Sequence, residues 1–162
     1  MDRADGIRAL KAGKSGSVMT AAEAREFFKN TKVAGSESKF KSGKYECSKG
    51  SVYFRSLWEA NWAVYLDWLI KKGEIKDWQY EPERFFFDRQ KLGTQSYCPD
   101  FKVFGTDGSV WYEEVKGRMD PISKTRMKRM KKYHPAIKVN IIDRKMYENT
   151  IHALGRVIKF YE

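Results

Sequence analysis

Short runs of apolar and aromatic residues, several of them alternating with polar residues, follow one another through the middle and end of the chain. These runs are bounded by Gly, Pro, Asp or Ser, which favour turns. They predict strands over 75–80, 84–87, 101–104, 110–116 and 137–142. A turn at Thr106-Asp107-Gly108 joins the third of these strands to the fourth.

Helices are predicted where apolar residues recur at helical spacing behind a capping residue. The predicted helices span 20–29, 57–72, 121–133 and 145–154. Ser56 caps the second helix and Gly73 ends it, while Asp120 followed by Pro121 starts the third. The second helix is apolar around most of its circumference, so we expect it to be heavily buried.

The first part of the chain differs from the rest in composition. Residues 1–18 are rich in Gly, Ser, Lys and Arg with little periodicity, and residues 30–49 are polar and carry several lysines. We therefore expect a basic N-terminal arm over 1–43 that contains the short helix. A single domain over 44–162 follows, and it begins with a small hairpin around Ser48-Lys49-Gly50.

The chain of 162 residues carries a formal net charge of +11. Such a charge favours a polyanionic partner, namely DNA, RNA or an anionic membrane surface. A membrane is disfavoured because no run approaches the roughly 20 apolar residues that span a bilayer. The N-terminus also lacks the apolar segment of a signal peptide.

Cysteine and histidine are scarce, which excludes several kinds of site. The two cysteines, Cys47 and Cys98, have no CxxC spacing, and there are two histidines. This pattern is not that of a zinc site or a disulfide framework, and it indicates a reducing, intracellular setting. Nucleophilic catalysis by Ser or Cys lacks a convincing histidine partner.

Two carboxylates and an ammonium group are spaced so that they can meet. Asp100 stands directly before the strand 101–104, while Glu114 and Lys116 share one face of the strand 110–116. Carboxylate oxygens suit Mg²⁺, and Mn²⁺ can take its place. We expect the trio to bind a divalent metal and to poise a water molecule for phosphodiester hydrolysis, with Lys116 orienting or helping to ionise that water.

The loop between the two strands decides whether Asp100 reaches Glu114. A two-residue turn at Asp107-Gly108 pairs Asp100 with Val115 and turns it away from Glu114. A three-residue loop with Gly108 in the left-handed conformation, or a β-bulge, pairs Asp100 with Glu114 instead. The proposed site therefore requires an odd-length loop or a bulge in this hairpin.

Glu59 is the fourth candidate for the acidic cluster. On the predicted helix it shares an apolar face with Trp62, Ala63 and Leu66. A carboxylate on such a face is costly unless it is paired or bound to metal. Glu59 is therefore expected to complete the cluster from above the sheet.

Simpler interpretations of these residues stay open. Asp100, Glu114 and Lys116 could form a cross-strand salt bridge on a solvated sheet face. Glu59 could serve only to favour the dipole at the helix N-terminus. Glu113 points to the opposite face from Glu114 and is expected to face solvent or to join a salt bridge.

The predicted helix 121–133 and the residues before it are almost uniformly basic, with Asp120 as the one acid. Their basic residues are Arg118, Lys124, Arg126, Lys128, Arg129, Lys131 and Lys132. The apolar contact face of this helix is assigned to Ile122, Met127, Met130 and Tyr133. Solvated helix faces usually mix both signs of charge, so this helix favours contact with a phosphate backbone.

Several segments of the chain resemble the PD-(D/E)xK nuclease superfamily. Pro99-Asp100 and Glu114-Val115-Lys116 are similar to its signature, and Glu59 is similar to the helix glutamate that many members carry. Residues 54–59, 97–101 and 114–117 look like the phage endonuclease I group of Holliday-junction resolvases and related small phage nucleases. The resemblance covers roughly residues 44–142.

The resemblance implies an α/β fold in which a central mixed β-sheet is flanked by helices. This restriction-endonuclease-like core would carry the N-terminal helical or flexible extension. The resemblance also implies Mg²⁺-dependent hydrolysis that leaves 5′-phosphate ends, often by a homodimer that makes paired cuts. By this resemblance Glu59, Asp100, Glu114 and the Val115 carbonyl hold metal and Lys116 assists the nucleophile. Arg55, in the matched segment before Glu59, is counted among the nucleic-acid contacts.

The leading prediction is a metal-dependent DNA endonuclease of phage type, acting inside a host cell and selecting branched DNA by its structure. An alternative is a homing or mismatch-type endonuclease on the same core, with residues 1–50 as a DNA-reading arm. A different class is a non-catalytic nucleic-acid-binding module with a nuclease-like shape. That module predicts that neither Mg²⁺ nor the substitution Asp100→Ala affects function.

Overall fold

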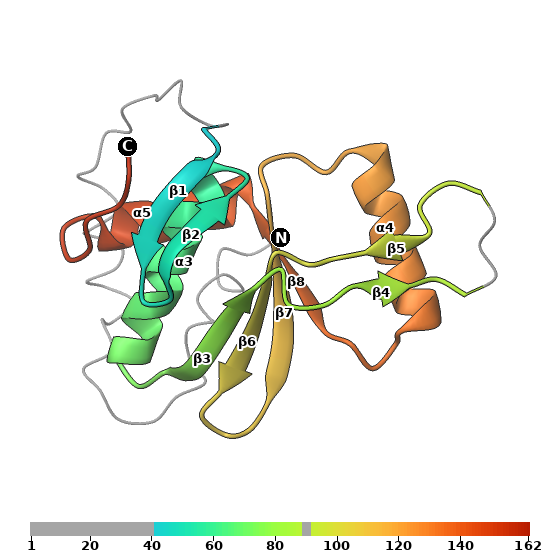
Figure 1. The fold of residues 1–162 in the computed structure, drawn as a ribbon, viewed down its shortest axis with the longest axis horizontal. Coiled ribbons are helices and arrows are strands. Elements are labelled where there is room, and N and C mark those ends of the chain that lie inside the picture. Colours follow the sequence, from blue (N-terminus) through green and yellow to red (C-terminus); the bar gives the residue numbers. More distant parts are fainter. Residues whose placement is uncertain (1–40, 89–91) are drawn as a thin grey trace, which may run out of the picture.

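The computed structural model describes residues 41–88 and 92–162. The predicted helix over 20–29 and most of the N-terminal arm lie outside the described residues. The elements, in chain order, are β1 (Gly43–Cys47), β2 (Gly50–Phe54), α3 (Leu57–Lys71), β3 (Ile75–Tyr80), β4 (Phe85–Phe86), β5 (Ser96–Tyr97), β6 (Phe101–Gly105), β7 (Val110–Lys116), α4 (Pro121–Tyr133), β8 (Val139–Asp143) and α5 (Arg144–Leu154) (Figure 1). None of the helices in the described residues has the length and apolar character needed to cross a membrane.

A mixed four-stranded sheet in the order β3-β6-β7-β8 forms the centre of the fold. β3, β6 and β7 are antiparallel neighbours, whereas β8 runs parallel to β7 after the crossover through α4. Two short ribbons, β1-β2 and β4-β5, stand apart from this sheet. The predicted α/β fold with a central mixed sheet is therefore confirmed.

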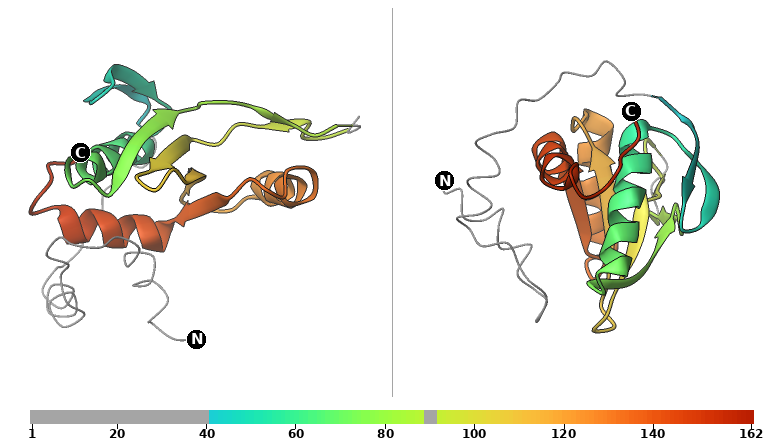
Figure 2. Two further views of the ribbon diagram at one scale, coloured as in Figure 1. Left: turned by 90° about the horizontal axis from the view of Figure 1, so that it is seen from below. Right: turned by 90° about the vertical axis from the view of Figure 1, so that its left-hand side faces the viewer.

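Both faces of the sheet are covered, and side chains along β7 alternate between them. Val115 packs in the main core with Trp62 of α3. Tyr112 packs in a second cluster with Met130 of α4 and with residues of the β4-β5 ribbon. Figures 1 and 2 show α3, α5 and the β1-β2 hairpin at one end of the molecule and α4 with the β4-β5 ribbon at the other.

Helix α3 begins and ends where its sequence signals place it. The Ser56 side chain accepts a hydrogen bond from the Glu59 amide at the N-terminus. Gly73 has a φ of 71° and donates its amide to the Ile70 carbonyl, which closes the last turn. The helix is heavily buried, as predicted, and its buried apolar residues are Leu57, Ala60, Trp62, Ala63, Leu66 and Leu69.

The hairpin between β6 and β7 has the three-residue loop that the site requires. The Gly105 amide donates to the Ser109 carbonyl at 2.8 Å, and Gly108 inside the loop has a φ of 82°. Phe101 pairs with Glu113. Asp100 directly precedes β6, so the predicted odd-length loop is confirmed, whereas the pairing of Asp100 with Glu114 stays a prediction.

Two details of the second cluster differ from the predictions. The strand predicted over 84–87 is only the two-residue β4, which pairs with an unpredicted β5. Ile122, assigned to the contact face of α4, is 57% exposed, whereas Met130 is buried. Ile122 stands in the first turn of α4. The buried side of α4 runs instead through Ser123, Met127 and Met130, whose spacing of three to four places them on one face.

Candidate active site

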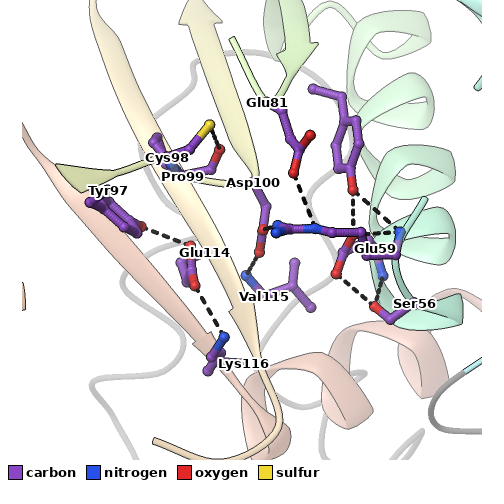
Figure 3. A network of polar contacts seen from close by, with 12 residues as sticks. Ser56, Glu59, Glu81, Tyr97, Cys98, Pro99, Asp100, Glu114, Val115 and Lys116 are labelled. Atoms are coloured by element: carbon purple, nitrogen blue, oxygen red, sulfur yellow. Dashed lines mark hydrogen bonds and ion pairs between the residues drawn. The ribbon is translucent and has the colours of Figure 1, made fainter. Parts of the chain in front are cut away.

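Three carboxylates that the sequence singled out are buried near one end of the sheet (Figure 3). Asp100 directly precedes β6, Glu114 lies on β7, and Glu59 lies in the first turn of α3. Their relative exposures are 3%, 5% and 7%. Buried charges are costly unless they are paired, so the partners of each carboxylate define what the site can do.

Asp100 lies between the other two acids. Its Oδ2 accepts the Val115 amide at 2.8 Å, and its Oδ1 lies 2.7 Å from Nη2 of Arg55. Burial, followed by the negative charges of Glu114 and Glu59, raises the pKa of Asp100 well above its ordinary value, and the two hydrogen-bond donors only partly offset this. Burial and the neighbouring acids therefore disfavour a negative charge on Asp100.

Glu114 is held by one phenol and one ammonium group. Its Oε2 accepts the Tyr97 hydroxyl at 2.8 Å, and its Oε1 lies 3.4 Å from Nζ of Lys116. Burial, together with the charge of Glu114, raises the pKa of Tyr97, so the hydroxyl stays protonated and donates. The side chain of Lys116 is 28% exposed, so its ammonium lies between the buried acid and solvent. The predicted meeting of Glu114 and Lys116 on one face is confirmed.

Glu59 lies on the α3 side of the sheet, whereas Glu114 lies on the α4 side. Its Oε1 accepts the Ser56 hydroxyl at 2.9 Å, and its Oε2 accepts the Tyr80 hydroxyl at 2.5 Å and the Arg55 amide at 3.1 Å. Glu59 is thus buried as predicted. It also accepts hydrogen bonds at the N-terminus of α3, so the simpler interpretation of Glu59 as a residue that stabilises this helix end applies as well. The charge of Glu59 acts on Asp100.

Arg55 belongs to the acidic cluster, although the sequence assigned it only to nucleic-acid contacts. Its Nη2 pairs with Asp100, while its Nε lies 3.1 Å from Glu81 and 3.9 Å from Glu59. The i,i+4 spacing of Arg55 and Glu59 was a signal for one of these pairs. No local pattern indicated the pairs with Asp100 and Glu81, because they join segments far apart in the chain.

The donor atoms at this site fit a divalent metal in their chemistry. Asp100 and Glu114 offer hard carboxylate oxygens, which Mg²⁺ and Mn²⁺ favour, and a bound cation would offset the burial that raises the pKa of Asp100. Within residues 41–88 and 92–162, no group of three or more His, Cys, Asp or Glu residues is arranged to hold a metal ion. Asp100 and Glu114 are therefore the two side chains best placed to hold one.

Glu113 was expected to face solvent or to join a salt bridge, and this is wrong. It is 8% exposed, and its two oxygens accept the indole N–H groups of Trp62 at 2.7 Å and Trp111 at 2.8 Å. It does point away from Glu114, as predicted, but that face of β7 packs on α3. Burial raises the pKa of Glu113, although the two indoles oppose this.

Most basic side chains in α4 and in the segment before it are exposed, while others contact the rest of the protein. Arg118, Lys124, Lys128, Lys131 and Lys132 are exposed. Arg129 donates to the carbonyls of Thr94 and Leu92, so it holds the β4-β5 ribbon as well as carrying charge. The buried Nε of Arg126 has no hydrogen-bond partner among the described residues.

No protein-family model matches the chain. No curated protein matches it. A function for this chain is therefore inferred from the chemistry and geometry of the site.

Proposed function

We propose that this protein is a metal-dependent DNA endonuclease with a restriction-endonuclease-like core. One observation carries the proposal. Asp100, directly before β6, and Glu114 of β7 are both buried, the charge of Glu114 acts on Asp100, and the Lys116 ammonium lies 3.4 Å from the Glu114 carboxylate. A solvated cross-strand salt bridge, the simpler interpretation, is disfavoured because both carboxylates are withdrawn from water and the pKa of Asp100 is raised.

Each residue of the site has a distinct task in this proposal. The Val115 amide holds Asp100 and the Tyr97 hydroxyl holds Glu114, and both carboxylates would serve as metal ligands. Lys116 reaches Glu114 from the solvent side, where its ammonium can orient the attacking water and stabilise negative charge on the phosphate. Mg²⁺ or Mn²⁺ held by Asp100 and Glu114 would supply Lewis-acid stabilisation of the phosphate and a more acidic water.

The exposed basic side chains of α4 support a DNA partner. This helix packs on the sheet face to which Glu114 and Lys116 point, because Tyr112, two residues before Glu114, contacts the same cluster as Met130. Phosphates held by the helix would therefore lie on the same side of the sheet as the acids. The proposal also includes selection of branched DNA and a homodimer that makes paired cuts. Both features follow from the resemblance alone.

A cleavage assay tests the proposal. Supercoiled plasmid, a cruciform plasmid, a four-way junction and a mismatched duplex are each incubated with the protein and Mg²⁺, Mn²⁺ or a chelator. We expect cleavage in both metals, none in the chelator, and the fastest cutting of the branched substrates. Preference for the mismatched duplex would indicate the mismatch-type alternative instead.

The Arg55–Asp100 ion pair favours the second candidate, a non-catalytic DNA-binding module, because it already supplies Asp100 with a cation. This candidate predicts binding to all four substrates without cleavage in either metal. It also predicts that Asp100→Ala leaves binding unchanged. Metal-independent binding and no cutting would therefore replace the endonuclease proposal.

Replacing Lys128 or Lys131 by methionine is expected to weaken DNA binding about equally for all sequences. Each substitution should reduce the slope of log affinity against log salt concentration by about 1, because each removes one phosphate contact. Fluorescence anisotropy over a salt series measures this slope. Lys71→Met is the matched control, since it removes an exposed lysine at the far end of α3. An unchanged slope in both α4 variants would place the DNA on another surface.

A further inference from the structure

Arg55 combines a fixed backbone with a side chain that is free to move. It follows the buried Phe54 at the end of β2 and precedes the helix cap Ser56, and its amide is held by Glu59. Its side chain is 55% exposed, although the guanidinium contacts the buried Asp100. The group can therefore leave Asp100 toward solvent without disturbing the backbone that carries it.

Glu81 lies on the outer side of this guanidinium and has an unusual backbone. It is the one non-glycine residue in the described part of the chain with a positive φ, 42°. Its amide donates to the Asp100 carbonyl at 2.8 Å, and its carboxylate lies 3.1 Å from Nε of Arg55. The chain thus holds a largely exposed acid in a strained conformation beside both Arg55 and Asp100.

Arg55 and a metal ion compete for one atom. The Val115 amide takes one lone pair of Oδ2 of Asp100, and Nη2 of Arg55 lies 2.7 Å from Oδ1, so a cation at Oδ1 meets the guanidinium directly. Mg²⁺ needs about 2.0–2.1 Å to each oxygen ligand and near-octahedral space around it. The guanidinium charge beside the same oxygen would also repel a divalent ion strongly.

We propose that Arg55 is an internal counter-ion that a divalent metal must displace from Asp100, and that Glu81 is the positioning residue that holds the displaced guanidinium. This inference rests on the proposed function, because it requires metal binding at Asp100 and Glu114. In the metal-free protein, Arg55 neutralises part of the acidic cluster. It thereby lowers the affinity of the site for metal, and Glu81 restores part of that affinity.

The affinity for Mn²⁺ without DNA tests this inference, measured by electron paramagnetic resonance of free Mn²⁺. Arg55→Met should bind Mn²⁺ about tenfold more tightly than the wild type, within the range typical of two coupled binding events. Arg55→Lys keeps a charge but loses the planar fork, so it should fall between the two. Arg84→Met is the matched control, since Arg84 is exposed and donates a hydrogen bond to Ser96 rather than to an acid of the cluster. It should change the affinity little.

A double-mutant cycle tests the role of Glu81. Glu81→Gln should weaken Mn²⁺ binding in the wild-type background, because the displaced guanidinium loses its partner. In the Arg55→Met background the same substitution should have no effect. An equal loss in both backgrounds would mean that Glu81 acts on the metal directly, which overturns its positioning role.

The outcomes separate failure of this inference from failure of the proposed function. Absence of Mn²⁺ binding in the wild type and in all variants contradicts the proposed function. Mn²⁺ binding that is equal or weaker in a folded Arg55→Met, checked by circular dichroism and thermal melting, contradicts the inference alone. If Arg55→Met does not fold, Arg55→Lys is used instead. An affinity of Arg55→Lys for Mn²⁺ that is no tighter than that of the wild type then contradicts the inference.

Discussion

Replacing Lys116 by methionine is expected to lower the rate of DNA cleavage by roughly 100- to 10,000-fold, the usual contribution of a positioned proton-transfer or charge-stabilising group. Methionine has a similar length but lacks the ammonium that lies 3.4 Å from Glu114. DNA affinity should change little, because Lys116 is one positive charge beside the many of α4. Single-turnover cleavage of plasmid in Mg²⁺ gives the rate, and anisotropy in Ca²⁺ gives the affinity.

Glu114→Gln distinguishes the role of the metal from the role of the Lys116 ammonium group. It should lose cleavage to a similar extent, yet excess Mn²⁺ should restore part of it, because the substitution weakens a metal ligand. Excess Mn²⁺ should not restore Lys116→Met. Lys71→Met, about 18 Å along α3 from Glu59, controls for the loss of a lysine and should cut normally. Wild-type rates in both site variants would rule out the proposed catalytic centre.

Local sequence signals predicted much of the fold because they act within a few residues. The boundaries of β3, β7 and α4 were predicted as observed, since turn residues and the Asp120-Pro121 cap fix them. The register that turns Asp100 towards the face of Glu114 was also predicted, on the condition that the loop between the two strands has an odd length. A left-handed Gly108 sets an odd loop length, and loop length sets the register of the two strands.

The environment of Glu113 shows where such local rules stop. Alternation along a strand gives the face to which a side chain points, and Glu113 does point away from Glu114. Alternation does not reveal what covers that face. Here α3 covers it with Trp62, so an acid that looked solvated is buried between two indoles.

The partners of the acidic cluster were hidden for the same reason. Tyr97 reaches Glu114 from the β4-β5 ribbon, and Tyr80 reaches Glu59 from β3. Arg55 contacts Asp100 across 45 positions of sequence. The acids could be identified because Asp100, Glu114 and Lys116 stand at a distinctive spacing and Glu59 lies on an apolar helix face. A tyrosine or arginine at these positions is ordinary until the contact is seen.

Replacing Glu113 by alanine is expected to lower the free energy of unfolding by about 2–5 kcal/mol. Each buried donor left without an acceptor costs about 1–3 kcal/mol, and this substitution removes the acceptor of the buried Trp62 indole and of the half-buried Trp111 indole. The loss is large against the roughly 5–15 kcal/mol that stabilises a domain of this kind. Urea denaturation followed by tryptophan fluorescence and circular dichroism measures it. Glu148→Ala, which removes a half-buried carboxylate paired with Arg144 near the surface, should cost less than about 0.5 kcal/mol.

The difference in unfolding free energy between the wild type and Glu113→Ala should depend on pH. Burial raises the pKa of Glu113 in the folded protein above its ordinary value of 4.5. Between these two pKa values the native state holds a proton that the unfolded chain releases, so stability falls as pH rises through that window. The contribution of Glu113 is therefore fully present below pH 4.5 and smaller above the folded-state pKa. The stability difference between the wild type and Glu113→Ala should accordingly shrink from about pH 4 to about pH 8. A difference that grows with pH would mean that the two indoles stabilise the ionised carboxylate by more than burial costs it.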